Sequence, residues 1–249
     1  MNHQETTPPH CYYFKLGLLV TGKTEKTHLN KLFMPLMELG NCSFEVIRKI
    51  EQLGVITSHR KKLKMVGSGQ IIPTKDEERI GYPAREYLQK PCTYVILVDD
   101  LEYDRGEYAE QIFARYRRAL DTILKTEKKR ASVHFLVNMI EAYYFADAQA
   151  INQVLGTSLQ DYEGDVETIR HPKGDLKQLY RGFDEVEDGG KFLEYLNVEY
   201  VLSNPDTCAS LRTLFAWCLK ALGENLNDDQ YQLRNGILSE ITKGQLDED

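Results

Sequence analysis

The feature that most constrains the fold is a set of short, continuously apolar segments rich in β-branched and aromatic residues. Residues Tyr12–Val20 read YYFKLGLLV, and Tyr94–Val98 read YVILV. Continuous rather than alternating apolar character is typical of strands buried on both faces, as in a parallel sheet covered by helices. Ser132–Val137 predicts another such strand, and Ser43–Ile50 alternates like a half-exposed one beside the first. The pattern predicts an α/β protein with a mostly parallel, Rossmann-like sheet flanked by helices.

Helical patterns separate these strands and then replace them. Within the first 155 residues, helices are predicted at residues 29–40, 83–90, 107–125 and 141–154, and residues 54–82 are irregular. After about Leu155 only helical segments are predicted, at residues 176–180, 191–196 and 211–222, with Gly189-Gly190 and Pro205 between them. We therefore expect an α/β core over residues 1–155 and a helical C-terminal extension over residues 156–249.

Composition narrows the class of protein. No apolar run approaches the roughly 20 residues that a membrane-spanning helix needs, and Met1–His10 lacks the basic and apolar regions of a secretory signal. The five scattered cysteines contain no C-x-x-C pair, which argues against a disulfide framework and a zinc site and favours a reducing cytoplasm.

The formal net charge is −7, so contact with nucleic acid would be local. Two basic clusters could provide this contact, residues 59–64 and Lys125 with Lys128–Arg130, and the residues predicted to guide the strand are Arg60, Lys61, Lys62 and Lys64.

The first strand runs into a sequence that matches a phosphate-binding motif. Residues 17–24 read GLLVTGKT, which fits the P-loop spacing G-x-x-x-x-G-K-[ST] and would make Lys23 a phosphate-binding residue. A P-loop, however, wraps phosphate with backbone N–H groups that leave the sheet. Here the middle residues, Leu18 to Val20, have strand character. A nucleotide-binding P-loop enzyme therefore stays as an alternative, next to a tight turn at Gly22 that opens a helix.

Acidic residues follow three of the predicted strands. Glu25 lies in the first turn after the first strand, and Asp99, Asp100 and Glu102 follow Val98. Glu141 and Asp147 follow the fourth strand. Ligands bind at the carboxyl edge of open α/β sheets, where these side chains should converge. Jointly ionised carboxylates need a cation, and hard oxygen ligands suit Mg²⁺ or Mn²⁺.

Several segments together resemble a known family. They are Val20–Glu25, Val95–Asp104, Ile140–Asp147, His171–Lys173 and Tyr180–Leu222. They resemble the TOPRIM domain of topoisomerases, primases and nucleases of the overcoming-lysogenization-defect type. The closer resemblance is to an uncharacterised TOPRIM-like family of domains of unknown function, often encoded in phage-defence neighbourhoods beside an AAA-type ATPase.

The resemblance implies a TOPRIM-like core and a nuclease site. It implies that Glu25 corresponds to an acidic metal-binding position, and it draws attention to His171 and Lys173. One departure is that Thr21 stands where the family pattern has a Glu that serves as metal ligand or general acid/base. Because threonine carries no charge, this departure weakens the inference of catalysis more than the inference of metal binding.

These observations lead to a hypothesis with two alternatives. The hypothesis is an Mg²⁺-dependent nuclease that hydrolyses phosphodiesters in DNA or RNA, in phage defence or mobile-element biology. Its predicted metal ligands are Glu25, Asp99, Asp100, Glu102 and Glu141. Lys173 would stabilise the developing phosphoryl charge. The first alternative is a degenerate, non-catalytic subunit that acts through an ATPase partner, and the second is the P-loop enzyme.

Overall fold

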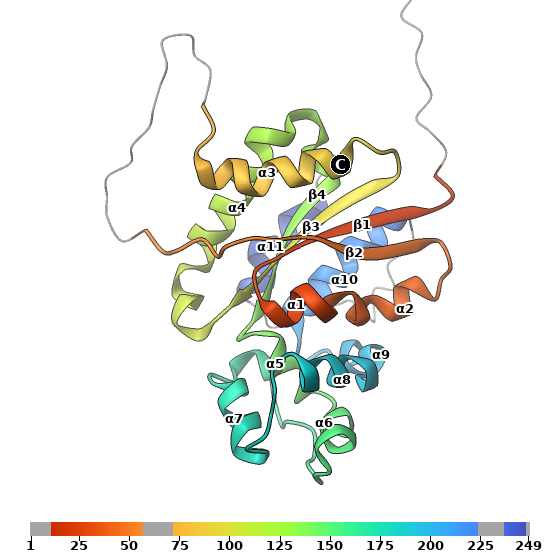
Figure 1. Ribbon diagram of the computed structural model, residues 1–249, viewed down its shortest axis with the longest axis vertical. Coiled ribbons are helices and arrows are strands. Elements are labelled where there is room, and N and C mark those ends of the chain that lie inside the picture. Colours follow the sequence, from red (N-terminus) through yellow and green to blue (C-terminus); the bar gives the residue numbers. More distant parts are fainter. Residues whose placement is uncertain (1–10, 57–71, 224–236, 248–249) are drawn as a thin grey trace, which may run out of the picture.

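A four-stranded parallel sheet forms the centre of the computed structural model, which describes residues 11–56, 72–223 and 237–247 (Figure 1). Its strands are β1 (Phe14–Val20), β2 (Cys42–Lys49), β3 (Thr93–Leu101) and β4 (Ala131–Val137). They are arranged in the order β2-β1-β3-β4, and every neighbouring pair is parallel. The predicted α/β class is confirmed, and the sheet is of the Rossmann-like kind.

Strand β3 extends beyond the predicted segment. It continues past Val98 to Leu101, so that Asp99 and Asp100 pair with Phe135 and Leu136 of β4. The prediction that the acidic residues begin where the strand ends is therefore wrong by three residues. The ladder holds both acids in extended conformation, and alternation along a strand sends their side chains to opposite faces of the sheet.

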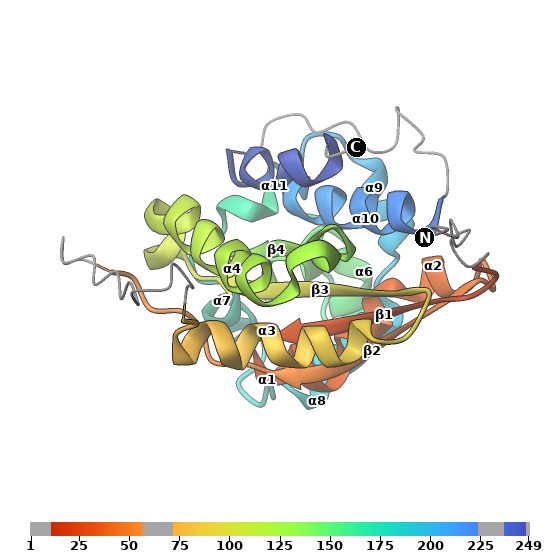
Figure 2. The same ribbon diagram turned by 90° about the horizontal axis from the view of Figure 1, so that it is seen from above.

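Helices cover both faces of the sheet, giving three layers (Figure 2). On one face lie α3 (Lys75–Leu88) and α4 (Ala109–Leu124), whose apolar residues pack on Leu19, Val95 and Leu97. On the other face lie the first helical segments and a late helix, packed on Leu16, Leu18 and Ile96. These are α1 (Lys23–His28), the 3₁₀ helix η1 (Leu29–Phe33), α2 (Met34–Met37) and α10 (Ala209–Leu222).

Helix α3 begins eight residues before the predicted start at Pro83. Thr74 caps it with a capping box, accepting a hydrogen bond from the backbone N–H of Glu77 while the Glu77 carboxylate accepts one from Thr74. Pro83 lies inside the helix, although proline usually ends or kinks one. Thr74 and Glu77 have the spacing of a capping box in the sequence, but Gly81 and Pro83 disfavour a helix and so argue against the one that follows.

The strands end with β4, and only helices follow it within the described residues. The predicted helix over residues 141–154 is two helices, α5 (Ile140–Tyr144) and α6 (Ala148–Leu155). The later helices are η4 (Val166–Thr168), α7 (Pro172–Leu179), α8 (Glu187–Tyr195), α9 (Val198–Ser203), α10 and α11 (Ile237–Asp247). The remaining 3₁₀ helices are η2 (Tyr103–Tyr108) and η3 (Lys125–Arg130).

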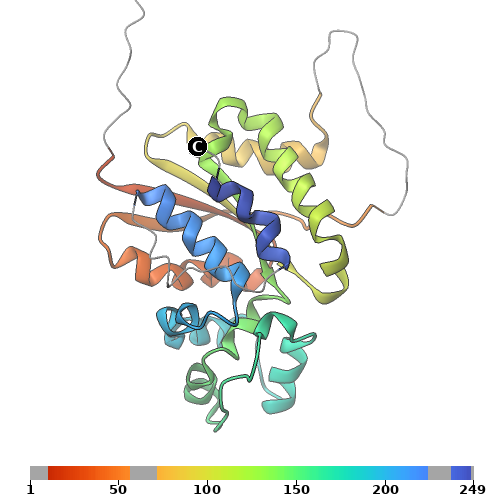
Figure 3. The same ribbon diagram turned by 180° about the vertical axis from the view of Figure 1, so that it is seen from behind.

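The segment from α5 to α9, residues 140–203, forms what we call the helical lobe. It lies beyond the carboxyl ends of the strands, while α10 and α11 return to the sheet (Figures 1 and 3). Gly189 and Gly190 do not separate helices, as the sequence suggested, but lie inside α8. A Cβ on Gly190 would lie 2.6 Å from the His28 ring, so the glycine pair lets α8 approach α1 closely. The lobe is thereby fixed against the start of the core.

The open edge of β4 is covered by the end of the chain. The Gln245 side chain of α11 accepts a hydrogen bond from Val133 N at 2.9 Å and donates one to Val133 O at 2.8 Å. The Arg117 guanidinium of α4 donates to Ala131 O. These side chains satisfy backbone groups that would otherwise offer a pairing edge to another strand. The helices after residue 155 thus complete the layer around the sheet.

Two observations bear on the expected cellular setting. Cys11 and Cys92 form a disulfide, so the prediction of a chain without disulfides is wrong at this pair. The two cysteines precede β1 and β3, which are neighbours in the sheet, and that proximity is invisible in a sequence separation of 81 residues. Among the described residues, no helix has the length and apolar character to span a membrane.

Candidate carboxylate site

Two of the predicted acidic residues meet at the carboxyl ends of β1 and β3. After Val20 the chain turns at Gly22, and Glu25 in the first turn of α1 folds back over that glycine. A Cβ on Gly22 would overlap Glu25 Oε2 and would lie 3.1 Å from Asp100 Oδ2. Gly22 is therefore required here because two carboxylates crowd its Cα, and not because it forms a phosphate-binding loop.

The Glu25 and Asp100 carboxyl groups lie within hydrogen-bonding reach of each other, which requires one of them to carry a proton or a cation to lie beside them. The pKa of Asp100 is raised well above its usual value, first by burial and then by the charges of Glu25, Glu141 and Asp99. No donor in the described part of the chain reaches Glu25 Oε2 or Asp100 Oδ1, and both atoms are buried. Buried acceptors without donors are rare in folded proteins.

A third carboxylate, Glu141, comes from the helical lobe. It is 3% exposed and lies in the first turn of α5. Burial raises its pKa to about 7, while the positive charge of Lys173 acts in the opposite direction. Glu25 is among the charges that raise this pKa, which places Glu141 in the same group of acids.

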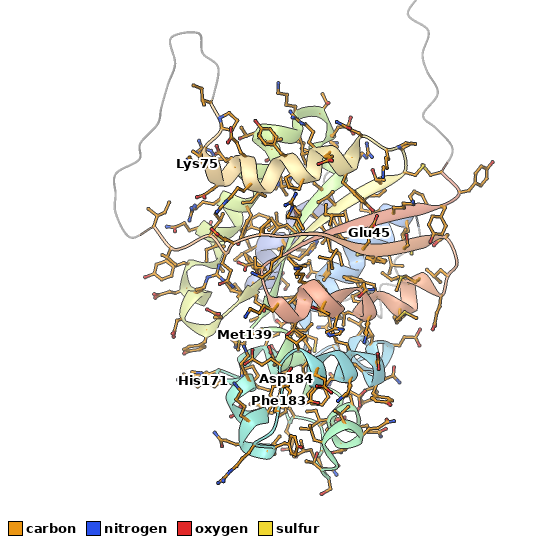
Figure 4. All side chains as sticks on the ribbon, in the orientation of Figure 1. Glu45, Lys75, Met139, His171, Phe183 and Asp184 are labelled. Carbon is orange, nitrogen blue, oxygen red and sulfur yellow. A yellow bond between two sulfur atoms is a disulfide. The ribbon has the colours of Figure 1, made fainter. Side chains whose placement is uncertain are left out.

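The backbone that delivers Glu141 is strained. Asn138 and Met139 both have positive φ, and Met139 (φ 72°, ψ 165°) is in a region that only glycine adopts easily. Hydrogen bonds fix this segment: Asn138 N donates to Leu101 O at 2.8 Å, and the Asn138 amide donates to Glu167 O at 2.7 Å. Figure 4 shows Met139 where the lobe joins the sheet. Such strain persists where the surrounding structure imposes it, and here it turns α5 toward the carboxylates.

Lys173 of α7 supplies the positive charge of the site. Its Nζ lies 2.9 Å from Glu185 Oε2 and 4.0 Å from Glu141 Oε1. Burial lowers the pKa of Lys173, but the hydrogen bond with Glu185 and the charge of Glu141 outweigh it and raise the pKa overall. Thr24 holds the Glu185 backbone, donating to its carbonyl at 3.0 Å. Sequence reasoning missed Glu185, which is one acid within the acidic stretch 184–188 and has no distinguishing pattern around it.

Asp99 is directed away from this group. Its Oδ2 lies 2.8 Å from Arg105 Nη2, and its Oδ1 accepts a hydrogen bond from Thr21 Oγ1 at 2.9 Å. The same hydroxyl accepts a hydrogen bond from Asp100 N at 3.2 Å. Thr21, at the position where the family pattern has Glu, therefore links β1 to the two acids of β3. Asp99 is a buried, paired carboxylate, and the structure does not place it with Glu25 and Asp100.

The other predicted site residues do not belong to the group formed by Glu25, Asp100 and Glu141. Glu102 is exposed at the start of η2, and Lys23 is exposed at the start of α1. His171 is exposed before α7 (Figure 4). Asp147 Oδ2 accepts a hydrogen bond from Asn197 N at 2.8 Å, which is a structural role. Arg60, Lys61, Lys62 and Lys64 lie outside the described residues.

The P-loop spacing does not form a loop. Gly17 to Val20 are strand residues that pair with β2 on one side and with β3 on the other. Their backbone N–H groups belong to these ladders, so they cannot wrap a phosphate.

Glu25 and Asp100 thus lie together at the carboxyl edge, the charge of Glu141 acts on Asp100, and Lys173 lies 4.0 Å from Glu141. Within the described ranges, no three His, Cys, Asp or Glu side chains are already arranged around one metal position. The donor set nevertheless fits a hard cation, because it consists of carboxylates and includes two buried oxygens without donors. Comparisons of the chain with protein-family models, with curated proteins and with solved structures found no match.

Proposed function

We propose that this protein is an Mg²⁺-dependent phosphodiester hydrolase with a TOPRIM-like core, acting on nucleic acid. The observation that carries the proposal is the pair of buried carboxylate oxygens, Glu25 Oε2 and Asp100 Oδ1, that have no donor among the described residues. A bound cation would compensate the burial and the neighbouring negative charges that together raise the pKa of Asp100. Carboxylate oxygens are the ligands that Mg²⁺ and Mn²⁺ prefer.

The groups around each residue of the site indicate the role that we propose for it. Glu25 and Asp100 would hold the metal ion, and Glu141 is the third carboxylate of the group. A bound Mg²⁺ supplies Lewis-acid polarisation of a phosphoryl oxygen. Lys173, half-buried beside Glu141, stabilises negative charge that develops on the phosphoryl group. Thr21 and Arg105 position Asp100 by fixing its backbone N–H and its carbonyl.

The resemblance to TOPRIM domains supports the same proposal. A parallel four-stranded sheet with acidic residues after β1 and on β3 agrees with that family's arrangement. Phage defence remains the proposed setting, and an AAA-type ATPase the proposed partner, on the resemblance alone.

A non-catalytic subunit is the second candidate, and one observation favours it. Thr21 takes the place of a catalytic Glu, and Lys173 already contributes a positive charge beside Glu141. A site neutralised in this way could keep its shape without a metal ion and serve only to bind a partner.

Cleavage and metal binding, measured separately, distinguish these two candidates. Purified protein is incubated with plasmid, single-stranded DNA and RNA in Mg²⁺, Mn²⁺ or EDTA, and Mn²⁺ binding is followed by electron paramagnetic resonance. The variants are E25Q and D100N, and the matched control is E102Q, which changes an exposed predicted ligand. Metal-dependent cleavage and Mn²⁺ binding that both fail in E25Q and D100N but persist in E102Q support the hydrolase. Wild-type protein that is folded but neither binds Mn²⁺ nor cleaves contradicts it.

A further inference from the structure

The charged groups around the carboxylate site are unevenly distributed. The helical lobe, on one side, contains thirteen acidic residues, ten of which are not buried, and five basic residues between positions 140 and 203. All three of its lysines are paired with carboxylates: Lys173 with Glu185, Lys177 with Glu185, and Lys191 with Glu187 and Asp188. Such a surface repels a polyanion.

The side formed by α1 and the end of β2 is different. Lys23 and Lys26 are exposed on α1, three residues apart and so on one face of the helix. Lys49 is exposed at the last position of β2, beside which α1 packs. None of these three lysines forms an ion pair with any residue that the structure describes.

A bulge in β2 brings Lys49 to this side. The register between β1 and β2 shifts between Leu18 and Leu19, so that Val46 pairs with Leu18 but Arg48 pairs with Leu19. One extra residue reverses which face the following side chains take. Lys49 consequently pairs with Val20, whose side chain lies on the face that α1 covers. Without the bulge, alternation would direct Lys49 to the face of α3.

We infer that Lys23, Lys26 and Lys49 form a phosphate-binding strip along which a single nucleic-acid strand reaches the carboxylate site from the α1–β2 side. The inference deepens the proposed function and rests on it. Lysine ammonium groups bind backbone phosphates as point charges without reading the sequence. The strip begins next to Gly22 and Glu25 in the chain, whereas the lobe carries an excess of acidic residues.

The test measures binding without cleavage. Fluorescence anisotropy of labelled 20-nucleotide single-stranded DNA and RNA is recorded in EDTA over a range of salt concentrations. The charge-reversal variant K23E/K26E/K49E is compared with K125E/K128E/K129E, which reverses three lysines of η3 at the amino end of β4. Circular dichroism confirms that both variants are folded.

The strip predicts that only the first variant loses affinity, by about tenfold or more at low salt. Its plot of log K against log salt should become less steep by about 2, since each phosphate contact on a single strand contributes about 0.7. Equal binding by both variants, a loss only in the η3 variant, or wild-type protein that binds neither strand overturns the inference.

The strip and the proposed function can fail independently. If wild-type protein does not cleave but binding depends on the strip, the hydrolase is wrong and the strip stands. If cleavage depends on Asp100 but binding does not depend on the strip, the strip is wrong and the hydrolase stands.

Discussion

Asp99 and Asp100 are neighbours in the chain, yet they belong to two regions with opposite electrostatics. On the α3–α4 face, Asp99 is fully buried, and Arg105 and Thr21 satisfy both of its oxygens. On the α1 face, Asp100 meets Glu25, and one oxygen of each lacks a donor within the described residues. Both acids are held by the same β3 ladder, so the difference lies in what the facing elements contribute.

The difference separates an acid whose charge is compensated within the fold from one whose charge is not, and the proposed cation would act on the second. The charge of a buried carboxylate that is paired with an arginine and a hydroxyl is compensated within the fold, so no ligand is needed to compensate it. A buried carboxylate beside another carboxylate is destabilising until a proton or a cation arrives. Thr21 separates the two regions, because its hydroxyl donates to Asp99 and accepts from Asp100 N.

The largest expected effect comes from breaking the paired region. Replacing Asp99 by Ala leaves the Arg105 guanidinium, which is 12% exposed, without its carboxylate. Removing one partner of a buried ion pair typically costs about 3–5 kcal/mol of stability. Urea unfolding should show a loss of that size in D99A and little change in E102A. A loss in D99A no greater than that in E102A would show that the pair is not buried in solution.

The next effect tests the ligand region. Mg²⁺ or Mn²⁺ at a concentration of about 100 Kd should stabilise the wild-type protein by about 2.7 kcal/mol, because the metal binds only the folded state. D100N and E25Q should show no such gain, and D99N should retain it if it folds. The measurement is urea unfolding with and without the metal ion. Equal stabilisation of D100N and wild type would place the metal elsewhere.

The sheet was predictable because its signal is local. Continuous apolar runs predicted the strands, and amphipathic patterns such as the one that ends at Gly40 predicted several of the helices, although α9 and α11 were missed. The carboxyl edge followed from the rule that ligands bind there, and it brought Glu25, Asp100 and Glu141 into one hypothesis. Predicting that part of the site required only the succession of strands along the chain and the positions of the acids that follow them.

What could not be predicted depends on side-chain direction and on distant partners. Nothing in the sequence distinguishes Asp99 from Asp100, since the choice follows from strand phase and from Arg105. Glu185 enters the site only because α8 packs on α1 through Gly189 and Gly190. The bulge that redirects Lys49 and the approach of Cys11 to Cys92 are likewise consequences of register and strand order.

A third buried carboxylate, Glu167, extends the comparison, because it accepts hydrogen bonds but forms no ion pair with any residue in the described ranges. Burial, followed by the charge of Asp165, raises the pKa of Glu167 from 4.5 to about 7. A raised carboxyl pKa contributes stability that is complete below pH 4.5 and is lost as the pH rises through 7. Between pH 5 and pH 8, wild-type protein should lose about 2 kcal/mol more than E167Q, measured by urea unfolding at both pH values. Gln keeps an oxygen for Ser210 N and Tyr143, so parallel pH profiles would contradict this assignment.

The smallest effect concerns Asp100 in the absence of metal. D100N replaces a carboxyl whose pKa is raised first by burial and then by the charge of Glu25, so the apo variant should be more stable than the wild-type protein at high pH. Because the pKa of Asp100 is raised, wild-type Asp100 becomes protonated as the pH falls, and the difference between the two proteins should shrink. A gain that is independent of pH would reflect packing rather than charge. A loss of stability in D100N would mean that Asp100, like Asp99, is already compensated within the fold, and the contrast between the two faces of β3 would disappear.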